Sequence, residues 1–542
     1  MDHNSPTSQR LAAVFLFGLA LITYLPSLGN GFIWDDDAYV QHNPTLRSAS
    51  GLLQIWTEPT STPQYYPLVY TTFWVEHNLW GDRPLGYHID NMLLHALGAV
   101  LLWRLLKRLK IPLPWLAAAI FAVHPINVES VAWITERKNV LSGVFYFVAF
   151  GTYLDAVESV TLNRRRYAAA LAFFLLALFS KTVIAAFPAA VLLVLWWKRG
   201  KLTGKEIGPL LPFFVVGIAL GSFTGYLERT HIGAHGVEWS SLTPIDRLLI
   251  AARAVWFYAG KLAVPIKLTF IYPRWSIDPH DIFQWIYLIA LVAVVIMLWR
   301  LRTRISRGPL TAVLFFIGTL FPALGFVNVY PMRYSFVADH FQYLAGIGLI
   351  VLFTATLVAL VRSAGLRTAI ATVVIAMLVV LSFSQQSIYK DGEALWRDTI
   401  AKNSNSWMAH ANLGHVLHAQ GRDEEGWQED QLALALAPNL AEPHFTVAIG
   451  DAIHGDLDGT IRQCRAAIAI DPDYAPAYAN LAKALLSQNK VAEALEAANQ
   501  AVQVAPDYAL GHFELAQVLE QMGNLPQAAQ EYQAAARLGM QQ

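Results

Sequence analysis

The sequence is short of charge. Only 14% of its 542 residues are Asp, Glu, Lys or Arg, and 55% are hydrophobic, whereas charged residues make up about 25% of a typical soluble domain. Lys and Arg number 39 and are balanced by 39 Asp and Glu, so the basic footprint of a nucleic-acid-binding protein is missing. This composition, with a mean hydropathy of +0.39, predicts a protein that crosses a membrane several times.

Cysteine is nearly absent. Cys464 stands alone, which excludes an intrachain disulfide framework and a cysteine-based zinc site. The motifs G-x-S-x-G, H-E-x-x-H and the P-loop do not occur, so the corresponding hydrolases, zinc proteases and ATPases lack their minimal parts. The first apolar run, residues 11–28, is followed by no small-x-small cleavage pattern. We therefore expect a retained anchor and not a signal peptide.

Eleven apolar runs are long enough to be counted as spans of a hydrocarbon core about 30 Å thick. Lys and Arg gather in every second connection between them, which by the positive-inside rule places the N-terminus in the cytoplasm and the C-terminus outside. The predicted spans are residues 10–28, 87–106, 113–124, 139–157, 167–180, 182–197, 209–226, 283–299, 310–328, 341–361 and 368–384.

A further apolar segment, residues 245–264, does not fit as a span. A crossing there would invert every later connection, and the segment carries Arg247, Arg253 and Lys261. We expect an amphipathic or re-entrant helix on the outer face, where one side is buried in the interface and the cations stay hydrated.

This orientation gathers the polar clusters on the outer side, and the inner connections are short and basic. The first outer loop, residues 29–86, opens with GFIWDDDAYV, in which Asp35, Asp36 and Asp37 directly follow the first span. Carboxylates at the rim of a bilayer are costly, because partial burial opposes their charge. They predict a reaction site at the membrane surface; the alternative is a solvated acidic cap. The other outer segments are residues 124–138, 180–181, 227–282 and 330–340.

From about Tyr389 the chain becomes Ala-rich and charged, and it repeats with a period of 34 residues. This period is typical of tetratricopeptide repeats, which stack into a solenoid whose concave face binds peptides or partner helices. The evenly spaced markers are Pro438, Pro472 and Pro506, together with Gly421, Gly455, Asn489 and Gly523. We expect a membrane domain over residues 1–386, a connecting helix over 387–406, and repeats over 407–542 that start at 407, 441, 475 and 509.

Residues 124–145, HPINVESVAWITERKNVLSGVF, resemble a signature of bacterial tetratricopeptide membrane proteins. These proteins are related to the animal TMTC family, the transmembrane O-mannosyltransferases with tetratricopeptide repeats. The chain departs from the family at Asn127 and His340, where members often carry His and Arg. Other matching pieces are FIWDDDAYVQHN, GYHIDNMLLHAL, SKTVIAAFPAAVLLVLWW, RAVWFYAGKLAVPIKLTFIYP and VADHFQYLAGIGL.

The resemblance implies an all-α fold, in which a polytopic helical bundle of GT-C type precedes the α-solenoid. It also implies a glycosyltransferase that takes a sugar, mannose by analogy, from a polyprenyl phosphate and transfers it to a hydroxyl of a protein or glycan. Such enzymes work on the non-cytoplasmic face, here of a bacterial inner membrane, which places the repeats in the periplasm. The partners are then membrane lipid, the lipid-linked sugar and an acceptor held by the repeats, with no nucleic acid.

In this family an acidic residue follows the first helix, and Asp35 and Asp36 match that position. A carboxylate that removes the proton of an attacking hydroxyl accelerates transfer by roughly 10²–10⁴-fold. We expect one of these two as the base and Asp37 as a helix-capping or solvated neighbour. The alternative is a divalent cation, Mg²⁺ or Mn²⁺, held by the three carboxylates, although a second acidic cluster is lacking.

The departing lipid phosphate calls for fixed cations. Arg137 is the first choice because it lies in the signature and a guanidinium binds phosphate through two donors. For a single lysine or arginine of this kind, snorkelling to the headgroups is the alternative. The candidates are Arg137, Lys138, Lys181, Arg253, Lys261 and Arg333, and the residues expected to support them are His88, His124, Glu129, Asp339 and His340.

Two functions remain open at this point. The first is the enzyme just described. The second is a non-catalytic, membrane-anchored periplasmic scaffold that acts through its repeats, since a fold does not fix a function.

Overall fold

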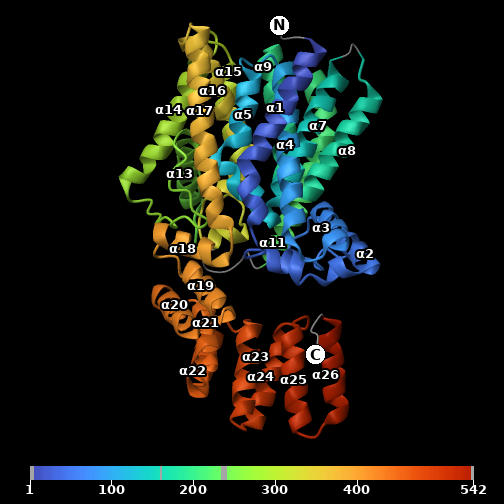
Figure 1. Cartoon of the computed structure of the whole chain (residues 1–542), viewed down its shortest axis with the longest axis vertical. Coiled ribbons are helices and arrows are strands. Elements are labelled where there is room, and N and C mark those ends of the chain that lie inside the picture. Colours follow the sequence, from blue (N-terminus) through green and yellow to red (C-terminus); the bar gives the residue numbers. More distant parts are fainter. Residues whose placement is uncertain (1–4, 159–160, 233–240, 539–542) are drawn as a thin grey trace. The chain divides into compact units, whose positions relative to one another are not determined.

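The computed structural model describes residues 5–158, 161–232 and 241–538, which fold into helices without any strand (Figure 1). The chain forms two compact units, Met1–Leu395 and Trp396–Gln542. Their boundary falls inside α18 (Gly392–Lys402), within the predicted connecting segment 387–406. The all-helical class follows the sequence prediction.

Seven helical segments in the described part of the chain are long and apolar enough to span a membrane, so the protein is a multi-pass membrane protein. An eighth is formed if α5 (Pro114–Val123) and Pro125–Ala132, which bend by 52° and include α6 (Val128–Ala132), count as one span. The seven helices are α1 (Pro6–Tyr24), α4 (Pro84–Arg108), α7 (Arg137–Val157), α9 (Phe187–Arg199), α11 (Leu211–Thr230), α14 (Trp285–Leu301) and α17 (Ala364–Gln385), some with short extensions.

All eleven predicted spans contain a helix, but three of these helices belong neither to the seven long apolar segments nor to the bent pair. α8 (Arg164–Ser180), α15 (Gly308–Leu320) and α16 (Gly346–Leu360) have 17, 13 and 15 residues. The predicted spans 310–328 and 341–361 were too long, because α15 gives way to a 3-10 turn and α16 is preceded by another, η11 (Asp339–Gln342). The three short helices lie beside the long ones in Figure 1.

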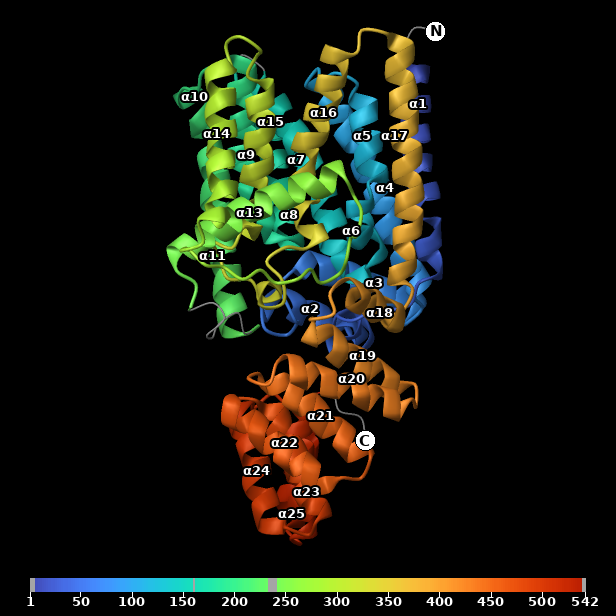
Figure 2. The same ribbon diagram turned by 90° about the vertical axis from the view of Figure 1, so that its left-hand side faces the viewer.

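α13 (Pro244–Ala263) is the segment that the charge pattern excluded as a span. Its start is fixed by a capping box in which Thr243 and Asp246 bond to each other's backbone. Figure 2 shows α13 lying across the long helices and not along them. Arg247 in its first turn donates to the Gly325 carbonyl at 2.7 Å. A helix that is not among the candidate spans is therefore present here, as predicted, and its first turn is bonded to the segment that follows α15.

The polar loops meet at one end of the first unit, opposite the N-terminus (Figure 2). The amide of Gly31 donates to the Lys390 carbonyl at 2.8 Å, and the side chain of Gln64 donates to Glu228 at 3.0 Å. These bonds join segments that are far apart in sequence. The first loop also contains α2 (Ala49–Thr57) and α3 (Pro67–Trp80), which cover this end.

The second unit repeats one pair of helices four times. The first helices of the pairs begin at 407, 441, 475 and 509, the four predicted positions. Each of them ends next to a residue with positive φ, such as Gly421 at 73° and Asn489 at 60°; Gly and Asn tolerate this left-handed conformation. The pairs are α19/α20 (Trp407–Ala419, Asp423–Leu436), α21/α22 (Ala441–Ile453, Leu457–Ile470), α23/α24 (Ala475–Ser487, Val491–Val504) and α25/α26 (Ala509–Gln521, Leu525–Arg537).

Candidate active site

The first loop is fastened by Asp36, which is fully buried. One carboxylate oxygen accepts from the amide of Ile33 at 3.0 Å, and the other accepts from the amide and hydroxyl of Thr135 at 2.9 and 2.6 Å. Burial raises the pKa of Asp36 to about 7 against the lowering effect of these bonds. Both oxygens of Asp36 are therefore occupied in holding the loop against η5 (Ile134–Glu136).

Trp34 lies beside the acidic run in a strained conformation. Its φ of 43° is in the left-handed region, which costs a residue other than glycine roughly 1–3 kcal/mol. Its ring stacks on Trp133 with the centroids 5.6 Å apart, and Phe270 packs edge-on against both rings. This packing holds the strained backbone and builds an aromatic wall next to Asp35.

A cavity of about 180 Å³ opens between these loops. Aromatic rings form one part of its wall, and charged side chains from the first loop, from α6, η5 and α7, and from η11 form another. The charged and imidazole groups in the wall are Asp35, Glu129, Glu136, Lys138 and His340, and the aromatic ones are Trp34, Tyr39, Trp133, Phe270, Tyr330 and Tyr334.

Asp35 contributes a carboxylate to the cavity. Burial raises its pKa to about 6; the charges of Lys138 and His340 oppose this shift, and that of Glu136 adds to it. The sequence did not separate Asp35 from Asp36. The structure distinguishes their surroundings, because Asp35 lines the cavity and Asp36 is enclosed by backbone and Thr135.

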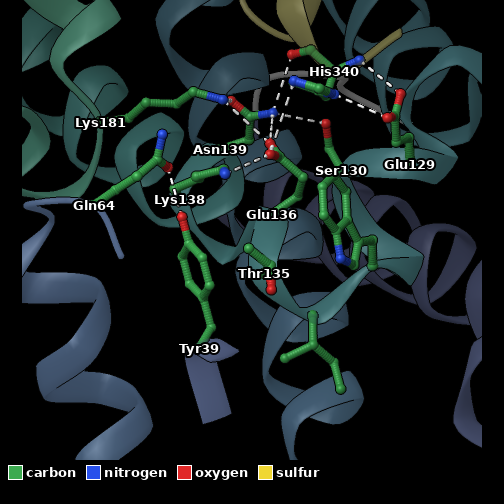
Figure 3. Close-up of polar contacts among 12 residues, drawn as sticks. Tyr39, Gln64, Glu129, Ser130, Thr135, Glu136, Lys138, Asn139, Lys181 and His340 are labelled. Atoms are coloured by element: carbon green, nitrogen blue, oxygen red, sulfur yellow. Dashed lines mark hydrogen bonds and ion pairs between the residues drawn. The ribbon is translucent and has the colours of Figure 1, made fainter. Parts of the chain in front are cut away.

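Glu129 holds His340 through two hydrogen bonds (Figure 3). The backbone amide of His340 donates to one carboxylate oxygen at 3.0 Å, and its ring Nδ1 lies 2.9 Å from the other. Glu129 is 2% exposed. The ring is thereby fixed with Nε2 toward Glu136, whose nearest oxygen is 4.0 Å away.

Glu136 lies at the centre of the cluster, and our sequence analysis did not select it. Its two oxygens lie 3.1 Å from Lys138 Nζ and 3.2 Å from Lys181 Nζ. Lys181 also donates to Asn139 at 2.8 Å. Figure 3 shows both lysines and His340 converging on this fully buried carboxylate. The run Glu136-Arg137-Lys138 in the signature is the signal that would have found it.

A second set of polar groups, which the sequence did not predict as site residues, closes one side of the cavity. The hydroxyl of Tyr39 donates to Gln64 at 2.6 Å, and Gln64 donates to Glu228 at 3.0 Å. The other oxygen of Glu228 accepts from the amide of Tyr330 at 3.2 Å. This chain of bonds joins the first loop to the end of α11 and to η10 (Tyr330–Arg333).

Arg137, the first choice for the donor phosphate, lies away from the cavity. Its guanidinium is 1% exposed and pairs with Glu76 at 2.7 Å. It also donates to the Tyr87 carbonyl at 3.0 Å and to the side chains of Asn91 and Thr72. Through these bonds the guanidinium of Arg137 joins α7 to α3 and α4.

The remaining proposed cations differ in their surroundings. Lys138 is the member of the six proposed cations that lines the cavity in the described part of the chain. The Arg253 guanidinium lies over Trp275, 4.4 Å from the ring centroid. Lys261 donates to the carbonyls of Ile266 and Lys267 at 2.8 and 3.0 Å. Arg333 belongs to η10, whose Tyr330 borders the cavity.

The other supporting residues lie near the cluster without entering the cavity wall. His88 is buried in α4. His124 Nε2 donates to the Leu262 carbonyl at 3.0 Å, and Asp339 accepts from the Tyr272 hydroxyl at 2.9 Å. His124 and Asp339 thus each join two segments that are far apart in sequence.

The metal alternative for Asp35, Asp36 and Asp37 finds no support. Among residues 5–158, 161–232 and 241–538 no three His, Cys, Asp or Glu side chains form a group that would hold a metal ion. Asp36 is taken up by hydrogen bonds, and Asp37 is exposed beside His42 at 3.3 Å. The three carboxylates therefore face three different surroundings.

Known proteins resemble both the repeats and the membrane unit of this chain. Residues 479–542 match the tetratricopeptide repeat family. Among solved structures, the crystal structure of MamA is similar at a TM-score of 0.24, with 16% identity over 29% of this chain and 88% of that chain.

Curated relatives cover the membrane unit as well. Human protein O-mannosyl-transferase TMTC1 is 25% identical over 79% of this chain and 55% of its own length. Protein O-mannosyl-transferase F38B6.6 of Caenorhabditis elegans is 31% identical over 25% of this chain and 22% of its own length. For human TMTC3 the values are 31%, 26% and 16%. The chain thus spans about half the length of TMTC1 and a smaller share of the other two relatives. It is a homologue of the TMTC protein O-mannosyl-transferases, with transmembrane helices and tetratricopeptide repeats.

Proposed function

We propose that the chain is a glycosyltransferase that moves one sugar, mannose by analogy with its relatives, from a polyprenyl phosphate to a hydroxyl of a protein or glycan. The observation that carries this proposal is the cavity in which Asp35 faces Lys138 and His340 beside an aromatic wall. Relatives named as protein O-mannosyl-transferases support it. At about 180 Å³ the cavity is smaller than the roughly 300–1,000 Å³ of drug-sized sites, which suits a single sugar ring.

Asp35 is the base in this proposal. The acceptor oxygen forms a bond to C1 of the sugar as the bond from C1 to the phosphate oxygen breaks, and the acceptor proton passes to Asp35. A base works best when its pKa is near the working pH, and burial brings the pKa of Asp35 to about 6. The products are the glycoside and the polyprenyl phosphate.

Lys138 and His340 receive the leaving phosphate. Negative charge grows on that group as the C1–O bond breaks, and preorganised donors in a dry site stabilise it without reorganising. The Lys138 ammonium lies 5.5 and 5.6 Å from the ring centroids of Tyr39 and Trp133. The Nε2 atom of His340 lies 4.0 Å from the same Glu136 oxygen that pairs with Lys138.

Glu129 and Glu136 are positioning residues. Glu129 fixes the His340 ring at Nδ1 and through the backbone amide. Glu136 holds Lys138 from behind and balances the charge of Lys181, so that two ammonium groups are kept close together. Buried cations of this kind need such a partner, because an unpaired buried charge is costly.

The site would face the non-cytoplasmic side, because the opposite end of the bundle carries the basic connections. Tetratricopeptide repeats bind extended segments on their concave face, which supports a role for residues 407–542 in presenting the acceptor. Retention of acceptor binding after removal of these repeats would contradict that role.

The test uses the purified full-length chain with a panel of polyprenyl-phosphate sugars, and it measures release of polyprenyl phosphate and transfer to peptide hydroxyls. The parent is expected to turn over one donor, and Asp35→Asn to lose roughly 10²–10⁴-fold in rate. Asp37→Asn is the matched control, since Asp37 is exposed, and it should keep the parent rate. Equal rates for Asp35→Asn and the parent would overturn the mechanism, and no turnover of any donor would favour the scaffold.

A further inference from the structure

A second cavity, of about 540 Å³, lies inside the membrane unit and shares no lining residue with the candidate active site. Its walls come from α4, α7, α9, α15 and α16, which lie together in Figure 2. Most lining side chains are hydrocarbon, including Leu102, Leu106, Phe150, Val351 and Ala355. A cavity of this kind between spans accepts an apolar chain and excludes a polar solute.

Three cations surround the mouth of this cavity. Lys110 is part of its wall. Lys198 lies with Nζ 4.0 Å from the ring centroid of the lining residue Trp197, and it donates to the carbonyl of Leu109, another lining residue. Arg307 lies between the lining residues Ser306 and Gly308, and its guanidinium is 5.9 Å from the ring centroid of Trp196, the neighbour of the lining residue Trp197. One end of an otherwise apolar cavity is therefore positive.

These cations differ from their neighbours in having no carboxylate. Nearby Arg108 pairs with Asp155 at 2.6 Å, and Arg199 pairs with Glu206 at 2.7 Å. None of the carboxylates in the described ranges lies within 4.0 Å of Lys110, Lys198 or Arg307. Lys110 and Lys198 are also close enough to repel each other. An anion between them would remove this repulsion.

We propose that this cavity binds a phospholipid with an anionic headgroup. One acyl chain lies among the five helices, and the phosphate sits at Lys110, Lys198 and Arg307. The charge of the mouth selects an anionic over a zwitterionic headgroup, as basic pockets between transmembrane helices do. The lipid belongs to the leaflet at the end opposite the candidate active site, so this site is independent of the proposed function.

Native mass spectrometry of the delipidated full-length chain measures the binding directly. The probes are phosphatidylglycerol and phosphatidylcholine with identical acyl chains. Each cation near an anionic headgroup contributes roughly fivefold in affinity, so phosphatidylglycerol should bind at least ~10-fold more tightly. Equal affinity for the two lipids would overturn the proposal.

Two sets of variants locate the lipid. Lys110→Gln/Lys198→Gln/Arg307→Gln should abolish the preference for phosphatidylglycerol. Lys201→Gln/Lys205→Gln/Arg304→Gln removes the same charge from exposed positions of the same end and should keep it. The same loss of preference in both sets would overturn the proposal, because the preference would then reflect net charge.

A steric variant covers the case in which the triple variant does not fold. Ala355→Phe fills the cavity wall and should lower the affinity for both lipids by roughly 10-fold or more. Unchanged binding would contradict the assigned place. Polyprenyl phosphate is the competitor: failure to displace phosphatidylglycerol supports the proposal, and displacement at equimolar concentration would overturn it and make the cavity a donor-lipid site.

Discussion

The two ends of the membrane unit use the same kinds of charged residue in opposite ways. At the end that carries the candidate active site, Arg137 and Glu76 form an ion pair in which the side chains are 1% and 3% exposed. At the other end, Arg108 pairs with Asp155 at a similar distance, but these side chains are 23% and 44% exposed. Burial, and not the number of charges, separates these two ion pairs.

The difference has a physical cause. A buried ion must be matched by a partner, and removing that partner leaves a charge that the interior cannot solvate. An exposed ion loses little when its partner goes, because water and salt replace it. The following changes test this contrast, beginning with the largest expected effect.

Arg137→Met should cost about 3–5 kcal/mol of stability, because it leaves Glu76 buried and unpaired. The measurement is the melting temperature of the purified protein in detergent. Arg137→Met/Glu76→Leu removes both charges and should recover most of the loss. A single variant as stable as the parent would show that the buried pair is dispensable.

Glu136→Gln should lower the turnover of the donor by about 10²-fold, because Lys138 then loses the carboxylate that positions it. Steady-state kinetics should show the loss mainly in kcat. Glu158→Gln removes a carboxylate that pairs with Arg108 at the other end and should leave kcat unchanged. Similar kcat values for Glu136→Gln and Glu158→Gln would contradict the proposed difference between the two ends.

Glu129→Gln and His340→Gln should each reduce turnover by roughly 10-fold, since both disturb one fixed imidazole. The double variant should be no worse than either single variant, which corresponds to a coupling of about 0.5–3 kcal/mol. A double-mutant cycle on kcat/KM measures it. Losses that simply multiply would mean that Glu129 does not act through His340.

Arg108→Gln should change stability by no more than about 1 kcal/mol. The same melting experiment checks this at low and high salt, where the parent pair is increasingly screened. A loss as large as that of Arg137→Met would break the comparison.

The sequence predicts the repeats well, because their markers are local. A residue such as Gly421 or Asn489 ends a helix by its own backbone conformation, and the period of 34 follows from counting. The predicted convergence of polar loops at one end likewise needs only span counting and charge. The spans before and after η11 were overestimated, because an apolar run does not show where a helix breaks into a 3-10 turn.

The direction of individual side chains is beyond such reasoning. Glu136, Arg137 and Lys138 are adjacent where η5 passes into α7, yet Glu136 and Lys138 pair with each other and Arg137 pairs with Glu76. Arg137 was the first choice for binding the donor phosphate because of its guanidinium, yet it pairs with Glu76 and does not line the cavity. Asp35 and Asp36 are equally acidic in sequence, and only the fold shows that Thr135 occupies Asp36.

The pH dependence of donor turnover tests the central claim most directly. Asp35 must be ionised to accept the proton, and its pKa is raised by burial to about 6. The rate of the parent should therefore rise as pH increases through about 6 and then level off, while Asp35→Asn shows no such rise. A parent rate that stays flat from pH 5 to pH 8, or a rise that survives in Asp35→Asn, would contradict the account.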